Sequence, residues 1–233
     1  APLFGARWLP LQVRIVLALT ITAIVAVQVP SIEPAIISTA AGVMMMLVEV
    51  AIGLTAGLVL SILFSSVMLA GEKIATSAGL GFAAQVDPQT GGQTPVVSQT
   101  LYLFLTVLFL SLDGHLIALA TMMESYRILP IGGSLAPQVL IGAGINAAGT
   151  MFVAATIIML PIAMVLLLIN IAIGIITKSA PQLNLFSFGF PISLLAVFLL
   201  LYLSVGGLGD SMAQLIDDSI ANLQNMIKEM PSG

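Results

Sequence analysis

The sequence predicts an all-α membrane protein built from long helices and helical hairpins. Of its 233 residues, 59% are hydrophobic and only 7% are charged, whereas a soluble domain usually carries about 25% charged residues. An ionised side chain near the centre of a bilayer costs roughly 2.5 to 3.5 kcal/mol, so runs without charge indicate helices at membrane depth. Such runs cover residues 15–32, 50–71, 88–112, 128–177 and 179–209.

Composition and charge argue against several functional classes. The formal net charge is −4 and the six basic residues are scattered singly, so no cationic face is expected for nucleic acid. There is no cysteine and only one histidine, which gives neither a thiolate nucleophile nor the three or four ligands of a zinc site. No nucleophile elbow or phosphate-binding glycine loop is present. We therefore expect no enzyme, no metal and no cofactor.

Two apolar regions are longer than a bilayer requires. Residues 36–70 and 138–177 would form helices of about 50 and 60 Å, whereas the hydrocarbon layer is about 30 Å thick. Each run either bends back on itself or forms a long helix whose ends pack against other protein, and we favour long helices in an assembly. Pro161 is expected to kink the second helix without ending it.

Glu49, the one charge in the first run, could bind a coupling ion, but we favour a place near an interface or a bond to a neighbouring subunit.

The middle of the chain cannot form one continuous helix. Within residues 79–98 four glycines and two prolines interrupt the pattern: Gly79, Gly81, Pro88, Gly91, Gly92 and Pro95. At membrane depth, a non-helical backbone is tolerated only where it is buried in protein or lines a water-filled cavity, because lipid cannot satisfy its polar groups. This segment is therefore expected inside a cavity.

The triplet Asp113-Gly114-His115 interrupts the apolar stretch 96–123. An acid and an imidazole at membrane depth could relay protons. One acid and one histidine do not form a chain across a bilayer, however, so we predict a cap and a turn at a helix end.

A helical hairpin is predicted at the end of the chain, with a turn from Lys178 to Asn184, one arm at 138–177 and the other at about 191–230. From residue 210 the second arm carries a stripe at three- and four-residue spacing. Asp210 can cap the N-terminus of this helix, and Lys228 lies near its C-terminus, where a positive charge interacts favourably with the helix dipole. Asp217 and Asp218 on its polar face favour partner helices over anionic lipid. The stripe comprises Met212, Leu215, Ile216, Ser219, Ile220, Leu223, Met226, Ile227 and Met230.

Three stretches, in the same order, resemble the FliR family of flagellar type III export-gate subunits. The first, residues 69–96, reads LAGEKIATSAGLGFAAQVDPQTGGQTPV; the second is Asp113-Gly114-His115; the third, residues 181–191, reads PQLNLFSFGFP. Residues 228–231 are similar too. The assembly and turn motifs are therefore assigned to Asp113, Gly114, His115, Pro181, Gln182, Asn184 and Pro191.

The resemblance implies a single-copy subunit that closes a helical ring of FliP-type and FliQ-type subunits. Residues 1–137 would be the FliP-like part and 138–233 the FliQ-like hairpin. FlhB-type and FlhA-type components and unfolded export substrates would be the further partners. The ring would lie in the bacterial inner membrane, within the flagellar basal body and displaced toward the periplasm. Members usually begin with another apolar segment, so a truncated start is expected before Ala1.

The resemblance also identifies residues 82–98 as a plug loop that seals the export pore. Apolar side chains would exclude ions in the closed state, and glycines would allow displacement by substrate. The plug residues are Phe82, Val86, Asp87, Pro88, Gly91, Gly92, Pro95 and Val96, with hinges at Gly79 and Gly81.

Three other interpretations remain open at this stage. An injectisome gate subunit would have the same architecture, although Val86-Asp87-Pro88 and the 113–115 triplet favour the flagellar branch. A purely structural subunit would close the ring while its partners seal it. A small secondary transporter should show an internal repeat, but residues 138–203 contain no second copy of the interrupted segment.

Overall fold

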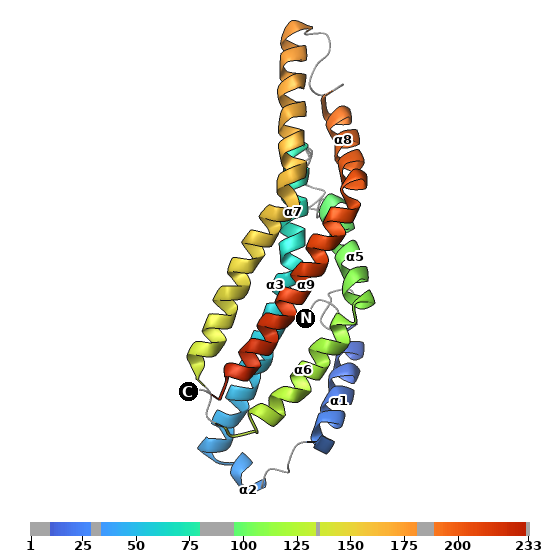
Figure 1. The fold of residues 1–233 in the computed structure, drawn as a ribbon. Coiled ribbons are helices and arrows are strands. Elements are labelled where there is room, and N and C mark those ends of the chain that lie inside the picture. Colours follow the sequence, from blue (N-terminus) through green and yellow to red (C-terminus); the bar gives the residue numbers. More distant parts are fainter. Residues whose placement is uncertain (1–9, 29–33, 80–95, 134–135, 181–188, 232–233) are drawn as a thin grey trace. The chain divides into compact units, whose positions relative to one another are not determined.

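The computed structural model describes residues 10–28, 34–79, 96–133, 136–180 and 189–231. Within these ranges the chain forms helices and turns and no strand, which confirms the predicted all-α class. Figure 1 shows the helices in chain order: α1 (Leu11–Gln28), α2 (Pro34–Ile37), α3 (Ala40–Ser77), α5 (Val96–Ser111), α6 (Gly114–Ile128), α7 (Pro137–Ser179), α8 (Phe190–Leu203) and α9 (Val205–Glu229).

The two longest apolar runs form single long helices, as predicted. Helix α3 has 38 residues and α7 has 43, which correspond to about 57 and 65 Å. Helix α7 continues through Pro161. Both are long and apolar enough to cross a membrane, and the bent pairs α5 with α6 and α8 with α9 raise the number of candidate spans in the described residues from two to four.

The second arm of the hairpin differs from the prediction of one helix. It begins at Phe190, within one residue of the expected start, but it breaks at Ser204 into α8 and α9, which are bent by 67°. Three glycines follow within five residues, and each costs about 1 kcal/mol of helix propensity relative to alanine. Because α9 begins at Val205, Asp210 lies in its second turn and does not cap it.

The apolar stripe of α9 is confirmed. All nine of its predicted members are buried, from Met212 to Met230. Lys228 lies in the last turn, whereas Asp217 and Asp218 are exposed on the other face. The stripe therefore packs against helices of this chain.

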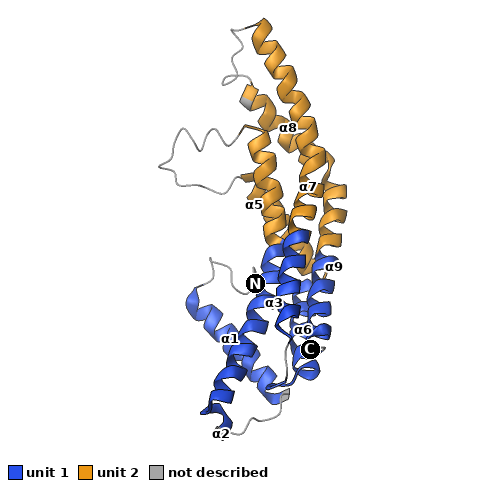
Figure 2. Cartoon of the chain, turned by 90° about the vertical axis from the view of Figure 1, so that its left-hand side faces the viewer, with its two compact units in different colours: residues 1–63, 113–149, 216–233 blue, residues 64–112, 150–215 orange. Residues whose placement is uncertain are grey.

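The chain divides into two compact units, which are coloured separately in Figure 2. Unit 1 comprises residues 1–63, 113–149 and 216–233. In its core, α3, α6, α7 and the end of α9 contribute buried side chains to one cluster. These are Val59, Leu60, Ala118, Leu129, Ala143, Ala147, Leu223, Met226, Ile227 and Met230.

Unit 2 comprises residues 64–112 and 150–215. Here α5 packs on the last turns of α3. The ring of Phe64 lies 5.4 Å from that of Tyr102 and 5.6 Å from that of Phe109, between centroids. At Gly71 the backbones come so close that an added Cβ would lie 2.5 Å from the Cα of Ser98. The contact between α3 and α5 therefore requires a glycine at position 71.

Candidate functional site

The predicted site residues divide into those that the structure describes and those that it does not. Gly79, Val96, Pro191 and the 113–115 triplet are described. Outside the described residues lie the hinge Gly81, the plug residues Phe82, Val86, Asp87, Pro88, Gly91, Gly92 and Pro95, and the motif residues Pro181, Gln182 and Asn184.

The N-terminal flank of the predicted plug loop is the end of α3. Gly79 has a φ of 81°, and its amide donates a hydrogen bond to the Thr76 carbonyl at 3.0 Å. This left-handed conformation is common for glycine just beyond a helix and is costly for other residues. Gly79 therefore ends α3, at the position where the sequence predicted a hinge.

The C-terminal flank is the start of α5, which begins inside the predicted loop. The last three residues of 82–98 are helical. No glycine or proline occurs between Val96 and Asp113, so the helix can extend back to residue 96. Val96 is 64% exposed, whereas Val97 and Ser98 are buried. Of these three, only Val96 presents an apolar side chain outward.

The two flanks are fixed against each other in unit 2. Besides the close approach at Gly71, the Ser98 hydroxyl donates a hydrogen bond to the Met68 carbonyl at 3.1 Å. A buried hydroxyl that satisfies a backbone carbonyl of another helix holds one relative position of the two helices. Gly79 and Val96, the described residues on either side of this segment, thus adjoin one packed helix pair.

A second polar contact holds the end of α3 to the hairpin. The Asn170 side-chain amide of α7 donates to the Ser77 carbonyl at 2.8 Å, and its oxygen accepts a hydrogen bond from the Ser193 hydroxyl of α8 at 3.2 Å. Ser193 is only 2% exposed. The sequence analysis missed this chain of contacts. Its one signal was that Asn170 is the only amide side chain in residues 150–179.

We expect Asn170→Ala to lower the free energy of unfolding by about 1 to 2 kcal/mol, because it removes two interhelical hydrogen bonds, each of which contributes roughly 0.6 kcal/mol or somewhat more in a membrane protein. Ser193→Ala should cost less, since it leaves the bond to Ser77. The measurement is denaturation of the purified chain in mixed detergent micelles. In a double-mutant cycle the two substitutions should be non-additive; strict additivity would show that the two side chains act independently.

The Asp113 triplet forms the predicted cap and turn, with Asp113 as the N-cap residue of α6. Asp113 has a φ of 54°, and its carbonyl accepts hydrogen bonds from the amides of Leu116 and Ile117. Its carboxylate makes no capping bond. His115 follows in the first turn of α6, and its Nδ1 atom is buried without a hydrogen-bond partner among the described groups.

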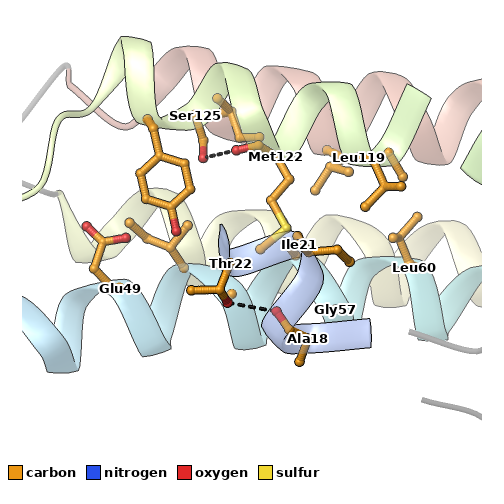
Figure 3. Close-up of a pocket in the computed structure, with 16 residues that line it drawn as sticks. Ala18, Ile21, Thr22, Glu49, Gly57, Leu60, Leu119, Met122 and Ser125 are labelled. Atoms are coloured by element: carbon orange, nitrogen blue, oxygen red, sulfur yellow. Dashed lines mark hydrogen bonds between the residues drawn. The ribbon is translucent and has the colours of Figure 1, made fainter. Parts of the chain in front are cut away.

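Unit 1 contains a mostly apolar groove of about 340 Å³ between α1, α3, α6 and α9 (Figure 3). Two of its polar side chains bond to their own helices: the Thr22 hydroxyl donates to the Ala18 carbonyl at 2.8 Å, and the Ser125 hydroxyl to the Met122 carbonyl at 2.7 Å. Glu49 is the one charged residue in the lining. We call this site the Glu49 groove.

Comparison with known proteins assigns the chain to a family. Residues 1–219 match the family described as bacterial export proteins, family 1. A protein named flagellar biosynthetic protein FliR from Pectobacterium carotovorum is 37% identical over 194 residues, which cover 83% of this chain and 74% of the relative. The chain belongs to the FliR family. The FliR proteins of Escherichia coli K12 and Bacillus subtilis are 29% and 26% identical, and each match covers at least 97% of this chain and 88% of the relative.

Membership of the FliR family confirms the resemblance that the three sequence motifs indicated. It gives the chain a general role in flagellar protein export. The apolar helices α3 and α7 fit a protein of the inner membrane. The relatives are named flagellar biosynthetic proteins, and the matching family is described as one of export proteins; neither name is that of an enzyme.

Proposed function

We propose that this chain is a core subunit of the flagellar type III export gate. It closes a ring of FliP-type and FliQ-type subunits, and residues 82–98 seal the pore until an unfolded substrate displaces them. The main support for this proposal is the packing at the flanks of the plug loop, where Gly71 and Ser98 bring α3 and α5 into contact. A seal that moves under substrate needs fixed ends, and these contacts supply them.

The lengths of the helices support a ring of subunits around this chain. A helix of about 65 Å exceeds the hydrocarbon layer twofold, so lipid cannot cover all of α7. Its exposed face is nonetheless apolar along most of its length. The exposed apolar side chains include Ile141, Ile145, Phe152, Val153, Ile157, Leu160, Met164, Leu167, Leu168, Ile171 and Ile175. Neighbouring subunits on this face, in an assembly displaced toward the periplasm, would bury what the membrane leaves uncovered.

Gating by a plug needs no covalent step. Each elementary charge that leaks through an open pore dissipates about 2.3 kcal/mol per 100 mV of membrane potential. Apolar side chains that exclude water from a constriction prevent this loss. Opening would follow from the entry of substrate, delivered by FlhA-type and FlhB-type components.

Deletion of residues 85–93 should raise ion leakage through the assembled gate, because the deletion removes the centre of the proposed seal and leaves α3 and α5 intact. The measurement is the conductance of the purified complex in planar bilayers. A glycine–serine segment of equal length in place of 85–93 should leak as well, which separates apolar sealing from chain length.

Recovery of the partner subunits with both variants serves as the control for assembly. If assembled complexes of both variants conduct like the wild type, the plug proposal is wrong. The chain would then close the ring as a structural subunit while its partners seal it.

A further inference from the structure

We propose that α8 is a movable arm, which swings about the joint formed by residues 204–209 and is closed in its docked position by the hydrogen bond from Ser193 to Asn170. This inference rests on the proposed role in a gate, because a gate that opens contains parts that move. It adds which part of the chain moves and how that motion reaches the end of α3.

Two glycines of the joint serve neither packing nor backbone geometry. A Cβ added at Gly206 or Gly207 would meet no atom within 4 Å, and both residues are helical without a positive φ. Alanine would fit at both positions and would favour the helix over its alternatives by about fivefold at each. Glycine therefore weakens the helix here without a contact in return, which is typical of a position that needs conformational freedom.

The same glycines lie beside a sharp bend. Helices α8 and α9 meet at 67° (Figure 1), and Ser204 between them has a φ of −93° and a ψ of 2°. The amides of Ser204 and Leu208 nonetheless donate to the carbonyls of Leu200 and Ser204, at 2.9 and 2.8 Å. Sharp bends of this kind occur at serine and glycine. The joint can thus change its angle through a few backbone dihedrals.

One side of the joint is fixed and the other is loosely held. On the α9 side Leu208 and Met212 are buried, and a Cβ at Gly209 would lie 3.8 Å from the Phe104 ring of α5. On the α8 side, two of the residues 191–203 are buried in this chain, Ser193 and Val197. A segment with few buried contacts opens more easily than a well-packed one, so α8 is the side that moves.

A single polar contact closes the docked position and connects it to α3. The Ser193 hydroxyl donates to the Asn170 side-chain oxygen at 3.2 Å, and the nitrogen of the same amide donates to the Ser77 carbonyl at 2.8 Å. An amide accepts through its oxygen and donates through its nitrogen, so the bond from Ser193 orients Asn170 toward Ser77. Such a bond shifts an equilibrium by only about threefold in a membrane protein and can therefore break and re-form. Undocking of α8 would loosen the end of α3, two residues before Gly79.

The rival explanation for the open glycines is the close approach of a helix from another subunit. The two explanations differ in what alanine would do at positions 206 and 207. Alanine would obstruct a partner helix and reduce assembly. In a moving joint it would stabilise the observed helix, leave assembly intact and slow export. The bend at Ser204 favours the joint.

The first test measures flagellar export in cells and recovery of the partner subunits with this chain. Gly206→Ala combined with Gly207→Ala should lower export by roughly tenfold, with normal recovery and an unchanged or raised denaturation midpoint. Gly174→Ala is the matched control, because it is equally open but lies within the continuous helix α7, and it should change none of these. Normal export by the double variant would overturn the proposal. Loss of assembly or of stability would refute it in favour of a packing role.

The second test measures the motion itself in the purified export complex. The chain contains no cysteine, so Lys178→Cys and Leu195→Cys place two spin labels on exposed positions of α7 and α8, in a complex whose other subunits are free of cysteine. Their distance distribution should show two populations. The two alanines at positions 206 and 207 should reduce it to the docked population. A single distance without the alanines would refute the movable arm.

The inference and the proposed function fail in different ways. Normal export by the alanine variant, alongside leakage after deletion of residues 85–93, would refute the movable arm and leave the plug intact. Slow export by the alanine variant, without leakage after the deletion, would do the reverse.

Discussion

Gly71→Ala should destabilise the chain by about 3 kcal/mol, although alanine is the better helix former. The added Cβ would lie 2.5 Å from the Cα of Ser98 and 2.8 Å from its backbone nitrogen. These are backbone atoms of α5, so no rotamer change relieves the clash and the two helices must separate. Separation also breaks the bond from Ser98 to the Met68 carbonyl. Overpacking usually costs about 1 to 3 kcal/mol, and a clash with backbone belongs at the upper end.

Gly53→Ala is the matched control for this prediction. It makes the same chemical change in the same helix, but at a position where the new Cβ meets nothing within 4 Å. Because alanine exceeds glycine in helix propensity by about 1 kcal/mol, the control should leave stability unchanged or raise it. Denaturation of both variants in mixed micelles measures the difference. Equal effects would show that helix propensity, rather than the approach of α5, governs position 71.

The features that the sequence predicted well are those encoded locally. The great length of α3 and α7 follows from their apolar runs, because a long apolar run without strong breakers has few alternatives to a helix; the charged residues do not mark their ends, since α3 continues through Glu72 and Lys73. The buried stripe of α9 follows from its three- and four-residue period. The turn at Asp113 follows from residues 113–115, which have low helix propensity and interrupt an apolar stretch.

The features that the sequence did not predict depend on contacts between distant residues. The chain from Ser77 through Asn170 to Ser193 joins positions 93 and 23 residues apart. Nothing in the neighbourhood of any one of them specifies its partner. The close approach at Gly71 is similar, since glycine is common in membrane helices and the sequence does not show which one meets a backbone.

The break between α8 and α9 was missed for a different reason. The expected helix contained no proline after Pro191, and its hydropathy stayed high across residue 204. The three glycines at 206, 207 and 209 also indicate a break in the helix, but more weakly than a proline would. Glycines lower helix propensity without removing a hydrogen bond, so packing decides whether the helix bends there.

Leu223→Asp should have the largest effect on unit 1, with a loss of about 4 kcal/mol or more. Leu223 is 2% exposed and belongs to the cluster that joins α9 to α3, α6 and α7. The substitution removes a buried apolar side chain and places a carboxylate among apolar neighbours. No cation is present among the members of that cluster, and an unpaired buried charge is among the most destabilising changes known.

Ala221→Asp is the control for Leu223→Asp, because it separates the effect of burying a charge from the effect of aspartate on helix propensity. It introduces the same residue into the same helix two positions earlier, on the exposed face, where Asp217 and Asp218 already lie. Its cost should therefore be that of propensity, within about 0.7 kcal/mol, plus roughly 0.2 to 0.5 kcal/mol for each like-charge pair that it forms, with Asp217 at (i, i+4) and with Asp218 at (i, i+3). Mixed-micelle denaturation compares the two variants. A difference of several kcal/mol would show that the apolar stripe holds α9 in the chain, whereas similar losses would mean that the stripe contributes little beyond forming the helix.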